Sequence, residues 1–339
     1  MAIATSYNVT STKGAQTNLE NVLKTVEPTE TPLYSTLSQS AAPKATLNEW
    51  LVDSLASPEI GGVIDGVDLT ISDAQNLIDT RARLGNRVQT LRDIFSVSRQ
   101  AEMVDVAPGG SLMASSRAKS LLQLKRSIET AIGSGNDQSA GTSSAGALMC
   151  GLGIWSDPTA TGNTFDTSLK QGFRAVSGSR VSLASLTESA FRGLLQAVYT
   201  AAGSKGTYNL FAGPAVMNKI TDYTRSTTAN GNFSFDQDVS GKTLVRSVLT
   251  YVSDYSTINI IPDLFLGRVN GSASGTDTVE GTVNTDRAYL IPGDDTVSLK
   301  FLEGITIQDL PDNGAGKRAF SETMLSLRVS NPRALGSIV

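Results

Sequence analysis

The feature that most constrains this chain is a long segment, residues 111–132, whose apolar side chains recur at helical spacing. Steps of three and four place four of them on one side of an α-helix: Leu121, Leu124, Ile128 and Ile132. Ser111 can cap the start of this helix, and Gly133 can end it in the left-handed conformation. At about 1.5 Å per residue the helix would be on the order of 33 Å long. Because β-rich segments precede and follow it, the rest of the chain must be arranged around this rod.

The side of the predicted helix away from the apolar residues is polar. It carries mainly charged residues: Arg117, Lys119, Lys125, Arg126 and Glu129. We therefore expect one face of the helix to be buried and the other to be solvated.

The composition is that of a globular protein and excludes several kinds of active site. The 339 residues are 40% hydrophobic and 18% charged, with a net charge of −4 and no histidine. The lack of histidine excludes catalysis by Ser–His–Asp or Cys–His groups and zinc binding by a His–Glu–x–x–His motif. The charge and the lack of a basic block indicate at most weak, non-specific contact with nucleic acid. We expect no enzyme activity, cofactor or metal.

Other candidate chemical groups have ordinary structural explanations. Cys150 is the single cysteine, so no intrachain disulfide can form, and we expect a small buried residue rather than a reactive thiol. Asp294 and Asp295, like Asp65 and Asp68, lie beside glycine in predicted turns, where aspartate is common for local hydrogen bonding. No N-terminal signal pattern or long apolar run is present, and we expect no association with a membrane.

The first part of the chain predicts an arm followed by a β-hairpin. Residues 1–17 are small and polar, 18–25 suit a short helix, and the prolines within 27–37 favour an extended path. Segments 44–55 and 81–97 then have the composition of two strands, separated by a Gly- and Asp-rich loop over 57–77, with a break near Gly85.

Both faces of the first hairpin strand are apolar. Leu47, Leu51 and Leu55 alternate with Trp50 and Val52. Either both faces are buried within one domain, or the hairpin projects and is sandwiched between neighbouring subunits.

The returning strand is rich in arginine. The four residues are Arg81, Arg83, Arg87 and Arg92. They either form a solvated surface or bind carboxylates of an adjacent subunit, for which the guanidinium fork is well suited.

The rest of the chain predicts a mixed α+β fold. Residues 133–146 and 270–284 should be flexible loops, and 224–241 a polar loop. A second helix over 185–202 would have a capping box of Ser185 and Glu188 and end at Gly203, and a third would start at Pro214 after a strand over 208–212.

Alternating apolar residues predict strands at 297–307 and 325–329. Asp312-Asn313-Gly314 is a strong turn signal between them, so a long hairpin with a polar tip is expected.

Several stretches, in this order, resemble a known family. They are PTETPLYSTL (28–37), NEWLVDSLA (48–56), TLRDIFSVSRQAE (90–102), LKRSIETAI (124–132), GLGIW (151–155) and SETMLSLRVSNPRALG (321–336). The sequence resembles the SU10-like major capsid proteins of tailed bacteriophages, which have the Hong Kong 97-type fold.

The resemblance implies a division of the chain into four parts. These would be an N-terminal arm (1–44), an extended loop (45–97), a peripheral domain (98–180 and 296–339, with spine helix 111–132 and hairpin loop 310–319) and an axial domain (181–295). The implied function is self-assembly, as hexamers and pentamers, into an icosahedral shell around double-stranded DNA. The implied location is the virion capsid, after synthesis in the bacterial cytoplasm.

The resemblance also implies partners and contact residues. A portal protein is expected, and separate scaffolding and decoration proteins are possible partners. Candidate contacts between subunits lie in the hairpin strands and at the tip of the long hairpin: Trp50, Leu51, Arg81, Arg83, Arg87, Arg92, Asp312, Asn313, Lys317 and Arg318.

Three alternatives stay open from the sequence. The first is an encapsulin-like nanocompartment shell, which resembles the same fold. The second is a tail or baseplate protein, in view of the many Thr, Ser and Gly residues. The third is an enzyme that works without histidine.

Overall fold

The computed structural model describes most of the chain beyond residue 26. The described residues are 27–55, 58, 60–62, 65–66, 68, 81–104, 110–203, 206–223, 249–269, 278–279, 286–311 and 316–339. The predicted arm, the helix at 18–25, the turn at 312–314 and the polar loop at 224–241 lie outside them, as do most of the loops at 57–77 and 270–284.

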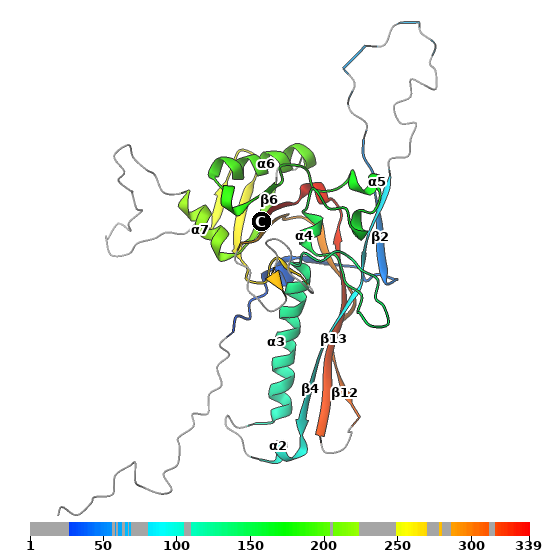
Figure 1. Cartoon of the computed structure of the whole chain (residues 1–339), viewed down its shortest axis with the longest axis vertical. Coiled ribbons are helices and arrows are strands. Elements are labelled where there is room, and N and C mark those ends of the chain that lie inside the picture. The colour runs from blue at the N-terminus through cyan, green and yellow to red at the C-terminus, as the bar shows by residue number, and fades with distance from the viewer. Residues whose placement is uncertain are drawn as a thin grey trace, which may run out of the picture.

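A long helix lies beside a long, narrow sheet (Figure 1). The helix is α3 (Leu112–Ile132), close to the predicted bounds. The sheet has the order β1-β12-β13-β4, with strands β1 (Ser38–Ser40), β12 (Val297–Leu310), β13 (Gly316–Val329) and β4 (Gln89–Ser98). The predicted long C-terminal hairpin is confirmed, because β12 and β13 pair in antiparallel register.

The ends of α3 are fixed by contacts of different kinds. The Ser111 hydroxyl caps the helix by accepting a hydrogen bond from the Ala114 N–H at 3.3 Å, as predicted. The left-handed conformation predicted for Gly133 is wrong, because its φ is −77°. A side chain at Gly133 would instead come within 3.0 Å of the Leu266 side chain, so this glycine is needed for close packing.

A second sheet forms the other half of the body. Its order is β5-β14-β11-β6-β8-β7, with β5 (Arg180–Val181), β14 (Gly336–Ile338), β11 (Ala288–Pro292), β6 (Thr207–Ala212), β8 (Thr257–Pro262) and β7 (Thr250–Val252). Helices α6 (Glu188–Ala202) and α7 (Pro214–Asp222) pack on one face through an apolar cluster that includes Phe191, Leu195 and Ile220. The opposite face, with Phe211 and Tyr289, joins the central core.

The predicted ends of these helices are partly confirmed. Gly203 has a φ of 65° and closes α6 in the left-handed conformation, and Pro214 occupies the start of α7. The predicted capping box is wrong, because Thr187 is the N-cap and accepts from the Ala190 N–H at 3.2 Å. Ser185 lies instead in the short 3-10 helix η3 (Leu183–Ser185).

The remaining elements are short. They are α1 (Pro32–Thr36), α2 (Arg99–Met103), α4 (Leu152–Trp155), η2 (Asn163–Phe165), α5 (Ser168–Gln171), β9 (Arg268–Val269), β10 (Thr278–Val279) and η4 (Pro332–Ala334). The extended path predicted for 27–37 is therefore wrong over α1, where Pro32 begins a helix instead of preventing one.

The predicted first hairpin is confirmed, but the returning strand is interrupted at a different residue from the one predicted. Strands β2 (Leu47–Val52) and β3 (Ala82–Arg87) pair in antiparallel register. The chain breaks at Val88, whose N–H donates to the Thr46 carbonyl at 2.8 Å, and not at Gly85. Beyond Val88 the chain enters β4 and pairs with β13, so β4 belongs to the long sheet.

The core lies where the two sheets and the C-terminal end of α3 meet. Its fully buried side chains come from all three and from the short helices α4 and η2: Ile128, Ile132, Trp155, Phe165, Tyr289, Leu299 and Leu327. Each large apolar side chain buried in this way stabilises the fold by about 1.5–3 kcal/mol. This single cluster holds the helix and both sheets together.

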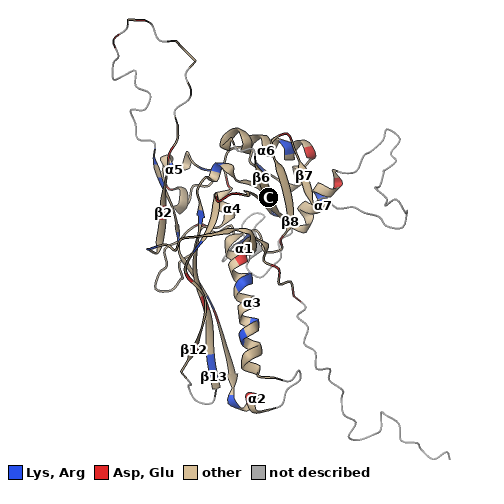
Figure 2. Cartoon of the chain, turned by 180° about the vertical axis from the view of Figure 1, so that it is seen from behind, with Lys and Arg blue, Asp and Glu red and all other residues tan. Residues whose placement is uncertain are grey.

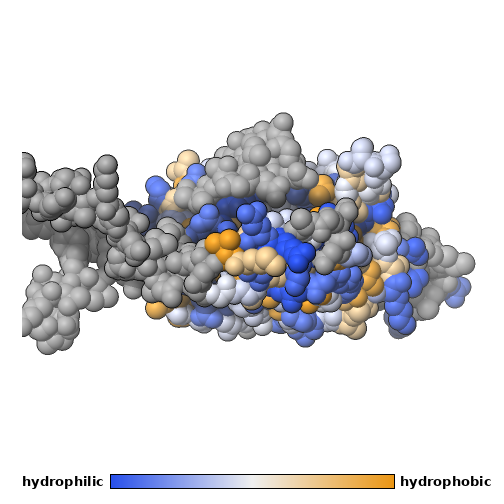
Figure 3. All heavy atoms as spheres, turned by 90° about the horizontal axis from the view of Figure 1, so that it is seen from below, coloured by the Kyte–Doolittle hydropathy of each residue, from blue (hydrophilic) through white to orange (hydrophobic). Residues whose placement is uncertain are grey.

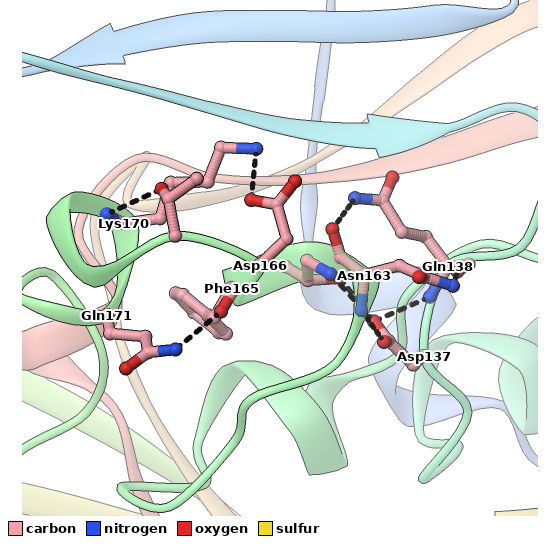
Figure 4. A network of polar contacts seen from close by, with 9 residues as sticks. Asp137, Gln138, Asn163, Phe165, Asp166, Lys170 and Gln171 are labelled. Carbon is pink, nitrogen blue, oxygen red and sulfur yellow. Dashed lines mark hydrogen bonds and ion pairs between the residues drawn. The ribbon is translucent and has the colours of Figure 1, made fainter.

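The loop after α3 is held by a network of polar contacts (Figure 4). The Asp137 carboxylate accepts hydrogen bonds from the backbone N–H groups of Gln138, Asn163 and Thr164. The side-chain amides of Gln138 and Asn163 each donate to the other's backbone carbonyl, at 3.2 and 2.9 Å. The prediction of a flexible loop over 133–146 therefore missed an Asp-centred anchor.

A buried amide joins the first hairpin to the body. Asn86 is fully buried, and its side-chain nitrogen donates to the carbonyls of Cys150 and Leu327 at 3.0 and 2.8 Å. Its side-chain oxygen accepts from the Cys150 N–H at 2.7 Å. One side chain thus connects β3, β13 and the segment before α4.

We predict that Asn86→Leu destabilises the protein by about 3 kcal/mol or more, because it leaves three buried backbone groups without this partner. The matched control is Asn48→Leu in the paired position of β2, where the amide nitrogen has no hydrogen-bond partner. Urea unfolding monitored by tryptophan fluorescence should separate the two variants. Equal midpoints would contradict the role assigned to Asn86.

Candidate assembly surfaces

The inner face of the β2–β3 hairpin packs on the body of its own chain. The Trp50 ring lies 5.7 Å from the Trp155 ring, which in turn meets the Phe165 ring edge-on at 5.5 Å. Ala82, Leu84 and Asn86 point the same way and are buried. Much of the Trp50 side chain therefore packs against its own subunit.

The outer face of the hairpin is exposed around Leu51 and partly covered around Leu47 and Arg87. We define it by Leu47, Glu49 and Leu51 of β2 with Arg83 and Arg87 of β3, which alternate with the buried positions. Leu51 is 65% exposed, and its cross-strand neighbour Arg83 is also exposed. From the sequence, either both faces are buried within one domain or the hairpin is sandwiched between neighbouring subunits. In the structure, the subunit itself buries the inner face.

More apolar residues are exposed where the hairpin strand leaves the body. Leu55 and Ile60 are almost completely exposed. Exposed large apolar side chains that occur close together mark sites of protein–protein contact.

The four arginines of the returning strand do not form one cluster. Arg83 lies 3.6 Å from Glu49 on the outer face, and Arg81 is exposed at the start of β3. Half-buried Arg87 lines a small cleft of about 310 Å³ together with Asp166 and Lys170.

Arg92 lies in β4 and is engaged within the chain. It pairs with Glu322 at 2.6 Å and lies over the Phe320 ring at 5.0 Å. The Glu322 side chain is 8% exposed and that of Arg92 is 51% exposed, so the pair covers a buried carboxylate from the solvent side.

The tip of the long hairpin is described only in part. Lys317 is exposed and Arg318 is half-buried, and they pair with Val97 and Ser96 of β4. Asp312 and Asn313 lie outside the described residues.

The lower end of the molecule also exposes apolar residues. Ile94 on β4 and Met103 and Val104 at the end of α2 are exposed. Figure 3, which views the molecule from below, shows hydrophobic residues interspersed with hydrophilic ones on this face.

Among the described residues, each of the two large sheets ends in a strand that has no further strand beside it. Strand β4 is the last strand of the long sheet, and β7, with exposed Val252, is the last strand of the second sheet. The free backbone groups of an edge strand can pair with a strand of another chain.

Over the residues that the structure describes, the basic side chains do not gather into a single patch. Figure 2 shows Lys and Arg distributed over α3, the hairpin and the lower end, with Asp and Glu among them. A polar cleft of about 570 Å³ between α3 and β4 contains Arg92 and Arg126, but Glu322 and Glu27 pair with them. Two of the four cations that line this cleft are thus paired with carboxylates, and Lys119 and Arg268 line it as well.

The described residues offer little for catalysis. Cys150 is completely buried, as predicted, and burial raises the pKa of its thiol. The predicted turn role of Asp294 is confirmed, because its carboxylate accepts from the Thr296 N–H at 3.0 Å. Among the positions that the structure describes, no three potential metal-ligating side chains come together. None of the described helices is long and apolar enough to cross a bilayer.

Two buried polar residues were missed by the sequence analysis. Asn86 gave no signal, since it lies in a strand segment with mixed polarity. Glu129 was placed on the polar side of α3 but is fully buried, where it binds the backbone of α1. Its position beside Ile128 at the edge of the apolar stripe was the available indication.

Solved structures with the same fold are phage and phage-like capsids. The capsid protein of a native GTA particle aligns with a TM-score of 0.61 at 10% identity, over 99% of each chain. The capsid of the cyanophage P-SCSP1u aligns with a TM-score of 0.56 at 11% identity, over 95% of this chain and 91% of that one. The capsid of Mycobacterium phage Bobi aligns with a TM-score of 0.55 at 13% identity, over 96% of this chain and 95% of that one.

Sequence comparison gives the family. No curated protein sequence matches the chain. The sequence profile described as SU10 major capsid protein, however, matches residues 4–339, nearly the whole length. This match favours the phage capsid over the nanocompartment, tail-protein and enzyme alternatives. The chain therefore belongs to the SU10 major capsid protein family, and it is a structural subunit of the icosahedral shell of a tailed phage, with the Hong Kong 97-type fold expected from its sequence.

Proposed function

We propose that copies of this chain assemble as hexamers and pentamers through surfaces that a single subunit leaves uncovered. The observation that carries the proposal is the outer face of the β2–β3 hairpin, where Leu51 is 65% exposed. A shell gains strength from many repeated contacts, and hairpins exchanged between neighbours multiply the buried area.

Four segments take four roles in this proposal. Residues 1–44 are the N-terminal arm, 45–97 the extended loop, 98–180 with 296–339 the peripheral domain, and 181–295 the axial domain. The pairing of β4 with β13 favours an extended loop that ends near Val88, with β4 counted in the peripheral domain. The spine helix is α3, and 310–319 is the hairpin loop.

The contact residues divide into two groups. Leu51, Arg81, Arg83 and Arg87 of the hairpin are accessible in whole or in part and are the main candidates. Trp50 and Arg92 can add only the part of their surface that their own chain leaves free. At the tip of the long hairpin, Lys317, Arg318, Asp312 and Asn313 remain candidates for contacts between neighbouring subunits.

The proposed partners beyond the shell are those of a phage capsid. A portal protein is included, and separate scaffolding and decoration proteins are possible additions. Contact with packaged double-stranded DNA is weak and non-specific, because the net charge is −4 and Arg92 and Arg126 of the cleft are paired with carboxylates.

Electron microscopy and sedimentation velocity of the purified full-length chain test this assembly. We expect closed shells, or rings of five and six subunits, together with fast-sedimenting species. A monodisperse monomer over a range of protein concentrations and salt conditions would contradict the proposal.

We predict that Leu51→Lys prevents or strongly reduces shell formation, since it places a charge in a proposed apolar contact. Leu169→Lys is the matched control, because Leu169 is an exposed leucine on α5, outside the hairpin. Both variants should unfold at the wild-type urea concentration, because neither leucine is buried. Normal shells from the Leu51 variant would exclude the outer hairpin face as an assembly contact.

A further inference from the structure

The carboxyl group of Glu129 holds the short helix α1 against α3. It accepts hydrogen bonds from the backbone N–H groups of Leu33 and Tyr34 at 2.6 and 2.7 Å. Pro32 has no N–H, and the Thr31 side chain makes no capping bond. Glu129 therefore provides the side-chain cap that α1 lacks within its own sequence.

A second buried carboxyl group lies beside the first. Asp263 follows β8, is 2% exposed, and lies close enough to Glu129 for its charge to raise the pKa of Glu129. Its Oδ1 accepts from the Phe265 N–H at 2.8 Å, whereas Oδ2 is buried without a donor from any described group. Two carboxylates cannot donate to each other, and a proton held between them would provide a donor for Asp263 Oδ2.

The charges around the pair indicate which oxygen keeps the proton. Arg268, from β9, favours the ionised form of Asp263, and its guanidinium lies over the Phe265 ring at 5.1 Å. Arg126 of α3 lies 5.5 Å from the centre of the same ring and pairs with Glu27. The nearby positive charge thus favours Asp263 as the carboxylate and Glu129 as the acid.

Three separate parts of the chain meet at this pair. Leu33, on α1, is completely buried in the central core. The segment after Asp263 closes on the end of α3, where the Gly267 N–H donates to the Gly133 carbonyl at 2.8 Å. The Glu129–Asp263 contact thus joins α1 and the second sheet to α3.

We propose that Glu129 and Asp263 form a proton-dependent latch that fastens the N-terminal segment to α3 when one proton is shared, and releases α1 when both groups ionise. The latch concerns docking within one subunit and does not depend on the assembly proposed above. It would make the attachment of residues 27–37, and of the chain before them, reversible without cleavage of a bond.

The sign of the pH dependence follows from the direction of the shift. Burial, and then the neighbouring Asp263 charge, raises the pKa of Glu129 from 4.5 to about 8. Because the folded form binds the proton more tightly than the unfolded form, its contribution is complete below about pH 4.5 and is lost progressively as the pH rises through about 8. The latch is therefore strongest in acid, weaker at neutral pH and weakest in mild alkali.

Hydrogen exchange of the full-length chain tests the latch. We expect the protection of the 33–37 amides, corrected for intrinsic rates, to fall about 10-fold between pH 7 and pH 9.5, as linkage to a single group that titrates near 8 requires. Glu129→Gln should abolish this dependence, since its amide can donate to Asp263 and accept one backbone N–H at any pH.

Two further variants make the test decisive. Asp263→Asn should weaken the pH dependence, because it removes the Asp263 charge and leaves burial as the cause of the raised pKa of Glu129, and it serves if the Glu129 variant does not fold. Glu102→Gln is the matched control and should retain the wild-type dependence, since Glu102 also binds a helix start but is exposed. Equal wild-type protection at both pH values, or a full 10-fold fall in both the Glu129 and Asp263 variants, would overturn the proposal.

Discussion

The packing of the C-terminal end of α3 between two sheets is the contact on which the rest of the structure depends. Ile128 and Ile132 are completely buried in the same cluster as Leu299 of the long sheet and Tyr289 of the second sheet. A single helix end thus joins two sheets that share no strand. The remainder of α3 runs beside β4 and β13 away from this joint, which gives the lower half its elongated shape (Figure 1).

This arrangement has a consequence for function. A body built around one joint leaves long surfaces without a partner, including the outer hairpin face and the β4 edge. In a monomeric enzyme such surfaces would be a liability, because exposed edges and apolar patches promote aggregation. In a shell protein they are the surfaces on which neighbouring copies can pack.

The sequence predicted the elements whose signal is local. The helical spacing around α3 and the alternation in β12 and β13 arise from burial of one face, and any chain with this pattern must bury it in the same way. The missed features depend on distant residues. Helix α1 is capped by Glu129, which lies 96 positions from Leu33, so no local pattern could distinguish it from an extended segment.

The candidate contact surface could be predicted only in part. The alternation in β2 identified two apolar faces, but the contact between Trp50 and Trp155 decides which of them the subunit covers itself. Similarly, four arginines near each other in sequence are separated by the break at Val88, with Arg92 in β4 and the other three in or just before β3. The fold matches capsids at 10–13% identity, which shows that it depends on the pattern of burial more than on particular residues.

The most direct measurement is a cryo-electron microscopy reconstruction of assembled shells at side-chain resolution. Our account predicts that the outer hairpin face, with Leu51 and Arg83, is covered by a neighbouring copy in every subunit, while Trp50 remains packed on Trp155 of its own chain. A shell in which that face is open to solvent would contradict the claim that assembly completes the surfaces left uncovered by one subunit.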